Sequence, residues 1–329
     1  MNRLIEIVRS FADRRMLIVG DAIADQFLYG NISRVSREAP VFILRHELTQ
    51  TVPGGAANCA MNLAALGARV SLIAAVGNDE SGRELRAKLE TAGVDASGVI
   101  VSDKIQTTTK VRILAGQSHS NKQQVIRIDY EGAALGTGQP RDSILEALKK
   151  TLASAEAVVI SDYNYGVLDD RAVGLIRESN PKSVLVDSRF RLFHFNGFTA
   201  ATPNEEEVES LIGRPIKSTD ELEIAGKTLR RQFGLRALLV TRGAQGMMLL
   251  ADDAAPLHIP AVGAQQSVDV TGAGDTVIAT FALAIASDAS FADAARLANH
   301  AGGLVVMKRG TASVTAAELE HSIRNSEDA

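Results

Sequence analysis

The stretch Val270-Thr271-Gly272-Ala273-Gly274-Asp275-Thr276 is the part of the sequence that says most about fold and function. An apolar run follows it, from 277 to 284. The two glycines allow a tight turn and a close approach of backbone to a ligand. The apolar run predicts a buried helix, whose first turn presents unpaired N–H groups and a positive dipole end to an anion. In that turn Asp275 could accept the proton of an attacking hydroxyl, as phosphoryl transfer requires. An ordinary glycine turn with an acidic residue near a helix start fits the same letters, so other segments have to decide.

Two better-known glycine signatures do not match the sequence. The dinucleotide fingerprint would need a third Gly or Ala where Val277 stands. Gly226-Lys227-Thr228 imitates the end of a Walker A motif, but the residue five positions before Gly226 is Glu221 and no strand pattern leads into it. The turn at 272–274 is therefore of another kind.

The composition is that of a soluble globular protein. The 329 residues are 46% hydrophobic, which is enough for a large core. A balance of 35 basic and 39 acidic residues, without a basic run, argues against nucleic acid as a partner. The longest apolar stretch, 277–286, is shorter than the about 20 residues that cross a bilayer, and charges near the N-terminus interrupt any signal-peptide core. We therefore expect a cytoplasmic protein without membrane contacts.

Cysteine and histidine usage excludes two further classes of site. Cys59 is the single cysteine, so the chain has no internal disulfide, and the sequence has no HxxxH or CxxC spacing for zinc. In its Ala-rich stretch, Cys59 is better explained as a small buried hydrophobe than as a nucleophile.

Short β-branched runs alternate with longer segments of helical apolar spacing along most of the chain. The runs predict buried strands at 16–19, 70–75, 157–160, 184–186, 198–201 and 237–241. The spacing predicts helices at 58–66, 80–92, 141–153, 170–178, 205–212 and 220–233, and mostly helix after 261, at 272–285, 291–308 and 315–324. Strand followed by helix, repeated, predicts an α/β fold with a doubly wound, mostly parallel sheet flanked by helices.

Two segments, 25–50 and 105–130, break this rhythm because they contain extended patterns without a crossover helix. They predict a small β-sheet that protrudes from a single domain spanning 1–329 and covers a ligand as a lid. A plain extra hairpin is the alternative. The exposed face of such a sheet is often buried by a second subunit, so a homodimer through the lid is the expected assembly.

Polar residues and glycines follow the first predicted strand, at the sheet edge where open parallel sheets bind ligands. Asp21 and Asp25 offer acceptors to sugar hydroxyls, although a cap or a turn explains them equally. Gly54 and Gly55 precede a helix, where backbone can approach a small polar ligand and Asn58 can donate and accept. A simple helix-start turn is the alternative there.

Two later motifs have the same double interpretation. Asn204 and Glu207 lie one turn apart at a helix start and suit hydrated Mg²⁺ near phosphates, but a capping box explains the same letters. Thr241, Gly243 and Gly246 close a strand in a turn that suits backbone passing beside a nucleotide, and an ordinary β-turn explains it too.

The joint order of these motifs resembles the ribokinase-like, PfkB-type, family of carbohydrate kinases over nearly the full length. The resemblance rests on the residues at 19–21, Gly54-Gly55 with Asn58, the 204–207 motif, the 241–246 turn and Gly272-Ala273-Gly274-Asp275. It implies an ATP-dependent sugar kinase that uses Mg²⁺, and it leaves activation by a monovalent cation open.

Finer details resemble the bacterial heptose 7-phosphate kinases of lipopolysaccharide core synthesis, in the segments 33–40, 52–58, 109–112, 124–129 and 268–271. Val268 stands where an aromatic residue is usual, and Asp187-Ser188-Arg189 stands where such kinases usually carry Asp-Pro-Lys. In those enzymes a kinase half is often fused to a nucleotidyltransferase half. This sequence ends at Ala329, so the resemblance implies a stand-alone kinase.

The resemblance implies a role for each matched residue. Asp275 acts as the base, and Gly272, Ala273 and Gly274 form the anion hole. The implied sugar contacts are Asp21, Asp25, Gly54, Gly55 and Asn58. The implied nucleotide contacts are Asn204, Glu207, Thr241, Gly243, Gly246 and Asn299, with Asn204 and Glu207 holding Mg²⁺ through water.

A phosphorylated sugar also needs cationic recognition, which free-sugar kinases lack. Lys110, Arg112 and Arg127 on the predicted lid strands could provide it, with Arg34 in the other lid segment. Solvated strand charges are the alternative.

We therefore predict transfer of the γ-phosphate of ATP to the anomeric C1 hydroxyl of D-glycero-D-manno-heptose 7-phosphate, giving the 1,7-bisphosphate for ADP-heptose and lipopolysaccharide core synthesis. A kinase for ribose, fructose 1-phosphate or tagatose 6-phosphate is the closest rival. A catalytically silent nucleotide-binding regulator is the rival from another class, and the presence of Asp275 beside both glycines argues against it. A nucleoside kinase fits less well, because only 4% of the residues are aromatic and could stack a base.

Overall fold

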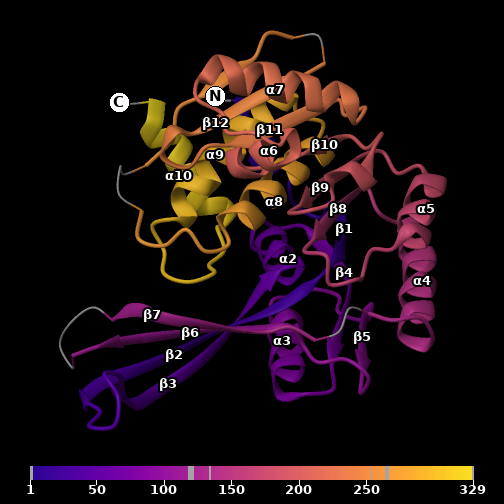
Figure 1. Cartoon of the computed structure of the whole chain (residues 1–329). Coiled ribbons are helices and arrows are strands. Elements are labelled where there is room, and N and C mark those ends of the chain that lie inside the picture. Colours follow the sequence, from indigo (N-terminus) through magenta and orange to yellow (C-terminus); the bar gives the residue numbers. More distant parts are fainter. Residues whose placement is uncertain (1–2, 118–121, 133–134, 253, 264–266, 328–329) are drawn as a thin grey trace.

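A nine-stranded sheet forms the centre of the molecule, with β1 as an inner strand (Figure 1). The computed structural model describes residues 3–117, 122–132, 135–252, 254–263 and 267–327. The strands, in their order across the sheet, are β13 (Leu257–Ile259), β12 (Met247–Ala251), β11 (Ala237–Thr241), β10 (Ala200–Ala201), β9 (Val184–Ser188), β8 (Ala157–Asp162), β1 (Arg15–Gly20), β4 (Arg69–Gly77) and β5 (Val99–Ser102). Pairing is parallel from β11 to β5, whereas β12 and β13 add an antiparallel edge. The predicted doubly wound, mostly parallel sheet is confirmed.

Helices cover both faces of this sheet, because successive side chains of a strand point to opposite faces. In β1, Met16 and Ile18 pack into one hydrophobic core, and Leu17 and Val19 pack into the other. The first core contains side chains of α1 (Arg3–Arg9), α2 (Ala56–Ala65), α3 (Glu80–Thr91), α8 (Ala273–Ala286), α9 (Phe291–Val305) and α10 (Ala316–Glu327). The second contains side chains of α4 (Gln139–Leu152), α5 (Asp170–Ser179), α6 (Glu205–Ile212) and α7 (Thr219–Gln232).

A second sheet of four strands extends away from this body at the lower left of Figure 1. Its order is β3 (Phe42–Gly55), β2 (Ala22–Val35), β6 (Thr109–Gly116) and β7 (Gln123–Tyr130). The β2–β3 and β6–β7 pairs are antiparallel, and β2 pairs with β6 in parallel. We call these four strands the lid. The strands β6 and β7 lie within the predicted segment 105–130, whereas β2 begins before and β3 ends after the predicted segment 25–50. Residues 118–121 of the second segment fall outside the described part of the chain.

The lid has two chemically different faces, which follow from its register. Directly paired residues share a face, so Asp25, Lys110 and Asp129 lie together, and Arg112 with Arg127 lie on the same side. The opposite face carries Gln26, Leu28, Val111, Ile113, Ile126 and Ile128. One side of the lid is therefore charged and the other largely apolar.

The strands β2 and β3 of the lid are joined to the body by almost no linking residues. A single residue, Asp21, separates β1 from β2, and β3 ends at Gly55 immediately before α2 begins.

Among the described residues, no helix combines the length and the apolar character that crossing a bilayer requires.

Candidate active site

The carboxyl ends of the parallel strands form the floor of the candidate site. The chain leaves β1 toward β4 and β5, and leaves β8 in the opposite direction toward β9, so the switch point of the sheet lies between β1 and β8. Open parallel sheets bind ligands at such a point. Asp21 follows β1 there, Tyr163 follows β8, and Thr202 follows β10.

The start of α8 carries the glycine turn that opened the sequence analysis. Gly272 is the N-cap residue with φ +76°, a left-handed conformation that favours glycine. A Cβ at this position would also lie 2.5 Å from Asn58 Nδ2. The Ala273 N–H donates to the Val270 carbonyl at 3.2 Å, so Ala273 closes the turn and does not offer its N–H to a ligand. Gly274 borders a cavity described below.

Asp275 occupies the third position of α8 with only 4% of its surface exposed. Its Oδ2 accepts a hydrogen bond of 2.8 Å from Asn58 Nδ2, and its Oδ1 accepts one of 3.4 Å from the Tyr163 hydroxyl. Burial raises the pKa of the Asp275 carboxyl from its ordinary 3.8 to about 7, because it penalises the charged form. The hydrogen bond from Asn58 opposes that rise, and the charge of Asp25 adds to it.

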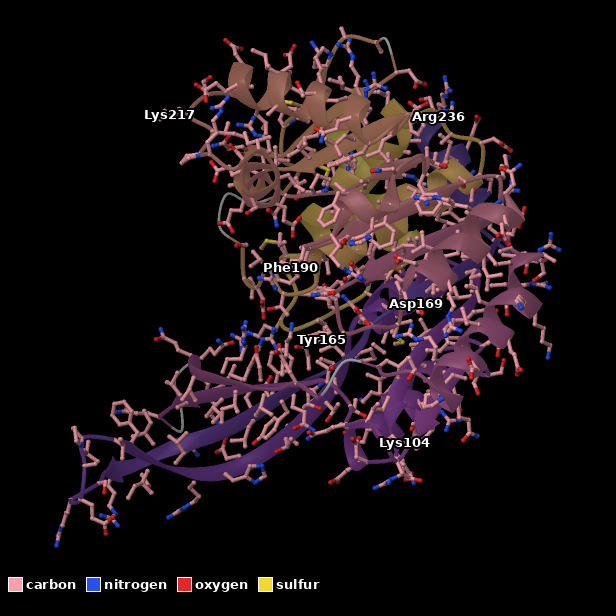
Figure 2. All side chains as sticks on the ribbon, turned by 45° about the vertical axis from the view of Figure 1, so that its right-hand side comes forward. Lys104, Tyr165, Asp169, Phe190, Lys217 and Arg236 are labelled. Atoms are coloured by element: carbon pink, nitrogen blue, oxygen red, sulfur yellow. The ribbon has the colours of Figure 1, made fainter. Side chains whose placement is uncertain are left out.

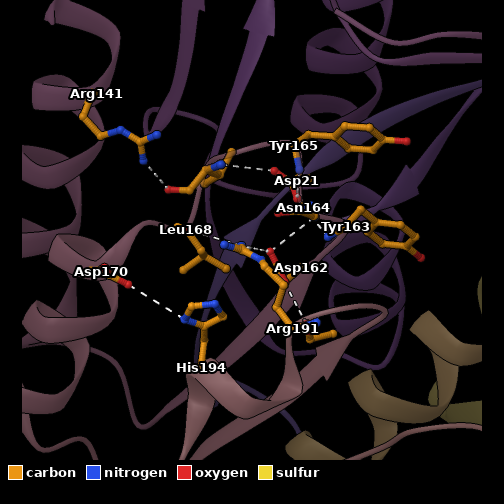
Figure 3. Close-up of polar contacts among 12 residues, drawn as sticks. Asp21, Arg141, Asp162, Tyr163, Asn164, Tyr165, Leu168, Asp170, Arg191 and His194 are labelled. Atoms are coloured by element: carbon orange, nitrogen blue, oxygen red, sulfur yellow. Dashed lines mark hydrogen bonds and ion pairs between the residues drawn. The ribbon is translucent and has the colours of Figure 1, made fainter. Parts of the chain in front are cut away.

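Asn58 and Asp21, predicted to hold the sugar, are engaged inside the protein. The Asn58 amide bonds Asp275 on one side and Asn62 on the other. The Asp21 carboxylate accepts backbone N–H groups of Tyr163 at 2.8 Å, Tyr165 at 3.1 Å and Val167 at 3.3 Å, and Figure 3 shows it within that loop. Only 2% of each residue is exposed, so both side chains are held by the protein in this structure, and their contact with a sugar stays a prediction.

The predicted lid residues next to the site are Asp25, Gly54, Gly55, Lys110 and Arg112. Asp25 forms an ion pair with Arg112, and an added Cβ on Gly54 would lie 2.4 Å from Asp25 Oδ2, so close packing requires glycine there. Lys110 is only 9% exposed and its Nζ lies 5.3 Å from the centre of the Tyr163 ring. Burial lowers the pKa of Lys110. These contacts show that Lys110 and Arg112 are not simply solvated strand charges.

Two other predicted cations lie differently. Arg127 pairs with its strand neighbour Asp129 at 2.8 Å and stays half-exposed, as the alternative of a solvated charge describes. Arg34 is exposed near the far end of β2, nine residues beyond Asp25, or about 30 Å at about 3.3 Å per residue. The structure therefore does not bring Arg34 to the other lid cations.

A cavity of about 630 Å³ opens on the body side of Gly274. Its walls include Asp187, Thr202, Glu207, Thr241 and Phe190, and Figure 2 shows Phe190 on the body beside it. Burial raises the pKa of Asp187 and of Glu207, and the Glu207 charge raises that of Asp187 further. The Thr202 hydroxyl is buried without a hydrogen-bond partner among the described residues. Two acidic residues and a threonine thus line the same cavity.

Asn204 and Glu207 form the capping box that the sequence left open as an alternative. The Asn204 side chain accepts from the Glu207 N–H at 2.8 Å, and Glu207 Oε2 accepts from the Asn204 N–H at 2.9 Å. In the described part of the chain, no cluster of three or more His, Cys, Asp or Glu side chains is placed to bind a metal ion. Asn204 Oδ1 and Glu207 Oε2 are therefore engaged in capping α6, while both residues line the cavity.

The remaining predicted nucleotide residues are spread over the neighbouring turns. Thr241 lines the cavity, and the turn from Gly243 to Gly246 is closed by a 2.9 Å hydrogen bond from the Arg242 N–H to the Gly246 carbonyl. Asn299 is buried in α9 and donates to the Pro260 carbonyl at 2.7 Å. Of this group, the structure brings only Thr241 to the cavity.

The segment 187–191 explains the departure from Asp-Pro-Lys. The Ser188 hydroxyl donates to Asp162 Oδ2 at 2.7 Å, which proline could not do, and Arg191 forms an ion pair with the same carboxylate. Figure 3 shows Arg191 beside Asp162 at the end of β8. The segment is therefore anchored to the floor of the site.

Sequence reasoning missed Tyr163, Asn62 and Thr276, and it did not include Asp187 and Thr202 of the cavity wall among its candidate site residues. Tyr163 follows β8 directly, so the same strand-end argument that singled out Asp21 could have found it. Asn62 lies one helical turn after Asn58, and Thr276 follows Asp275, but neither spacing shows a contact between two distant helices.

Comparisons with known proteins agree with this geometry. Residues 14–317 match the model of the pfkB family carbohydrate kinases. The chain is 44% identical over 322 residues to the bifunctional protein HldE of Caulobacter vibrioides, covering 96% of this chain and 65% of that protein. It is 41% identical over 314 residues to the bifunctional protein HldE of a Marinomonas species, covering 94% of this chain and 64% of that protein. The chain thus spans about two thirds of the length of these relatives.

Solved structures show the same fold at low sequence identity. Arabidopsis thaliana ribokinase, complexed with ribose and ATP, superposes with a TM-score of 0.75 at 22% identity, over 95% of this chain and 99% of that one. Phosphofructokinase-2 of Escherichia coli, in complex with substrates and products, superposes with a TM-score of 0.79 at 20% identity and the same coverage.

Proposed function

Because the chain belongs to the pfkB family of carbohydrate kinases, we propose that it transfers the γ-phosphoryl group of ATP to the anomeric C1 hydroxyl of D-glycero-D-manno-heptose 7-phosphate. The observation that carries the proposal is the buried Asp275 at the start of α8, within electrostatic reach of the lid cation Lys110. The 44% identity to a protein named HldE and the motifs shared with heptose 7-phosphate kinases support the choice of sugar.

The reaction consists of one proton transfer and one exchange of phosphorus–oxygen bonds. The C1 hydroxyl gives its proton to Asp275 while its oxygen bonds the γ-phosphorus, and the bond from that phosphorus to the leaving oxygen of ADP breaks. A carboxyl whose pKa is about 7 suits a base that works near neutral pH. Because phosphoryl transfer needs little covalent help from protein, holding the two substrates in line supplies much of the rate.

The start of α8 suits the charge that develops on the transferring group. The glycine turn brings the first backbone turn of α8 next to Asp275, and the positive end of the helix dipole favours an anion there. Gly274 on the cavity wall leaves that approach open, because an added Cβ would meet no atom closer than Asp187 Oδ2 at 3.8 Å. The cavity then offers room for the phosphates of ATP.

The side chains around the cavity fit a magnesium ion bound together with ATP. Asp187, Glu207 and Thr202 supply the hard oxygen atoms that Mg²⁺ prefers. Burial and mutual repulsion destabilise the two negative charges, and a divalent cation would relieve both. Mg²⁺ bound here would neutralise charge on the ATP phosphates. Asn204 takes part through the cap that holds Glu207 in place.

The distal phosphate of the sugar fits the charged face of the lid. Lys110 lies within electrostatic reach of Asp275, and Arg112 is paired with Asp25 on the same face. A phosphate dianion would replace water around these partly buried charges. With Asp25, Arg127 and Asp129 included, three cations and two carboxylates leave a net charge of +1 on this face. Asp25, which holds Arg112, remains the carboxylate best placed to accept from a sugar hydroxyl.

The apolar face of the lid supports the proposal of a homodimer. Ile126 and Ile128 on this face are 52% and 39% exposed, and all eight residues of the edge strand β7 are exposed. An edge strand with an apolar face favours pairing with a second copy.

The experiment that tests the function measures ADP release from Mg²⁺–ATP with heptose 7-phosphate, beside ribose, fructose 1-phosphate, fructose 6-phosphate and adenosine. We expect selective turnover of the heptose phosphate. Asp275→Asn serves as the blank, with kcat lowered about a hundredfold or more through loss of the base and with ATP affinity retained. Equal turnover of unphosphorylated heptose would contradict the sugar-phosphate assignment, and full activity of Asp275→Asn would contradict the base.

A further inference from the structure

Behind Asp275, buried polar side chains from α2 and α8 form a series of hydrogen bonds, which we call the relay: Thr276, Asn62 and Asn58. The Thr276 hydroxyl donates to Asn62 Oδ1 at 3.0 Å, and Asn62 Nδ2 donates to Asn58 Oδ1 at 3.2 Å. Asn58 Nδ2 then donates to Asp275 Oδ2 at 2.8 Å. Asn62 and Thr276 are fully buried, and neither takes part in the mechanism above.

Two backbone carbonyl groups fix the direction of the hydrogen bonds in the relay. Asn62 Nδ2 lies 3.0 Å from the Asn58 carbonyl oxygen, which can only accept, so the amide of Asn62 has its NH₂ on this side and its oxygen toward Thr276. Asn58 Nδ2 lies 3.4 Å from the Gly272 carbonyl oxygen, which fixes the second amide in the same way. Neither amide can flip without placing two acceptors against each other.

We propose that Asn62 and Thr276 are positioning residues, which hold the Asn58 amide so that it always donates to Oδ2 of Asp275 and leaves Oδ1 as the oxygen that takes the substrate proton. The inference rests on the proposed role of Asp275 as the base. The Oδ1 atom is the one that faces Tyr163 and the site floor, 3.4 Å from the phenol oxygen. The relay thus decides which carboxylate oxygen works, and it does so from a position that no substrate reaches.

The chain supplies a matched control one turn further along α8. Thr280 is as buried as Thr276, and both hydroxyls lie near the carbonyl one turn back, Gly272 for Thr276 at 3.3 Å and Thr276 for Thr280 at 2.9 Å. Among the described residues, only the Thr276 hydroxyl of these two also has a partner on another helix, Asn62. Thr276→Val and Thr280→Val therefore change the same atoms in the same helix and differ in the relay.

The first readout is the pH dependence of kcat for the two variants, with the sugar that the wild type phosphorylates. We expect Thr276→Val to lower kcat about tenfold or more, since small displacements of a catalytic group cost that much. The acid limb of the kcat profile of Thr276→Val should move to higher pH. The hydrogen bond from Asn58 lowers the pKa of Asp275, and the variant weakens that bond, so the pKa rises. Thr280→Val should keep both values, and Thr276→Ser should restore them. The KM for ATP should stay the same throughout.

The groups that share the field of Asp275 are unchanged in these variants: Asp25 on β2, Lys110 on β6, Tyr163 after β8, Asp187 on β9 and Cys59 on α2. Melting temperatures of all variants show whether the assays are run on folded protein. Equal kcat and acid limbs in Thr276→Val and the wild type would overturn the relay. Equal losses in Thr276→Val and Thr280→Val would do so too, because packing would then explain both.

A second readout does not depend on the sugar. In protein labelled with ¹³C at aspartate carboxyls, the Asp275 signal is assigned by its loss in Asp275→Asn, and its pKa is titrated directly. We expect Thr276→Val and Asn62→Leu to raise that pKa and Thr280→Val to leave it unchanged. If the pKa moves as expected while no tested sugar is turned over, the relay stands and the proposed substrate fails. If the sugar is turned over and the pKa does not move, the relay fails alone.

Discussion

Asp275 combines two properties at the scale of one residue: it is buried, and it has to lose a proton to act as a base. Burial raises its pKa to about 7, so at neutral pH the folded protein holds the carboxyl in balance between its two forms. The same burial makes the charged form costly for folding. Function and stability therefore oppose each other at this position.

We expect Asp275→Asn to be more thermostable than the wild type at pH 8, with a difference that narrows as the pH falls toward 5. Between the ordinary pKa of 3.8 and the folded value of about 7, wild-type Asp275 binds a proton when folded and not when unfolded. Its contribution to stability is full below pH 4 and is lost as the pH rises through 7, by at most about 4 kcal/mol at about 1.36 kcal/mol per pKa unit. Melting temperatures from calorimetry at a series of pH values measure this.

Asp21 provides the internal control for that experiment. Burial raises its pKa to about 6, and it is present in both proteins, so its effect cancels in the difference. A difference that is constant with pH, or that grows toward acid, would show that the pKa of Asp275 is not raised in the folded protein.

Residue roles were only partly predictable from sequence. Asp275 could be predicted because its turn, helix and acid are contiguous. The sequence also singled out Asn58 and Asp21, but it did not indicate their hydrogen-bond partners, at 275 and at 163–167, because these come from distant segments. A side chain that bonds its own protein and one that bonds a sugar have the same letter, so only the fold shows that these two are engaged.

At the scale of the elements, the lid strand β6 places a cation next to the base. We expect Lys110→Ala to raise the KM for the sugar phosphate about tenfold or more, as loss of a charge-assisted hydrogen bond would, and to change kcat little. Steady-state kinetics with a phosphorylated sugar and its unphosphorylated form measure this, and the free sugar should be affected less.

Lys122→Ala is the matched control for Lys110. Lys122 precedes β7 at the far end of the lid and pairs with Glu47, so its removal changes lid charge without touching the site. A fall in kcat at constant KM for Lys110→Ala, or an equal rise in KM for Lys122→Ala, would contradict the assignment.

The elements themselves were predicted well where period and length agreed. The six predicted strands of the large sheet are present, although only Ala200 and Ala201 pair in the predicted 198–201 strand. The predicted helix at 205–212 matches α6, and the others agree at their ends to within three residues. The sequence analysis missed α1, β5 and the β12–β13 hairpin, because these are short, and Met247–Ala251 has no β-branched residue to distinguish it from a helix segment.

At the scale of the whole molecule, the two faces of the lid differ in chemistry, and we expect them to make different contacts. The charged face turns to the site, and the apolar face carries Ile126 and Ile128. We expect the wild type to have twice the mass of one chain in solution, and the double variant Ile126→Lys, Ile128→Lys to be a monomer of 34.9 kDa. Light scattering after size-exclusion chromatography measures both masses.

Ile224→Lys is the control for that pair. Ile224 lies on α7 of the body and is 65% exposed, so the change adds the same charge to an exposed apolar residue away from the lid. A wild-type monomer, or a double variant that keeps the dimer mass, would show that the apolar face of the lid is not the contact.

The short connections of the lid limit how this molecule can be recombined with its relatives. One residue, Asp21, links β1 to β2, and none separates β3 from α2. A graft that exchanged the lid at its base would cut through Asp21, which holds the 163–167 loop, and through Gly54 and Gly55, which pack against Asp25 and the Asp21 carbonyl. The exchangeable piece is the outer half of the strands, near the turn from 36 to 41. For protein engineering, the base of the lid is part of the floor of the candidate site, so the two have to be exchanged together.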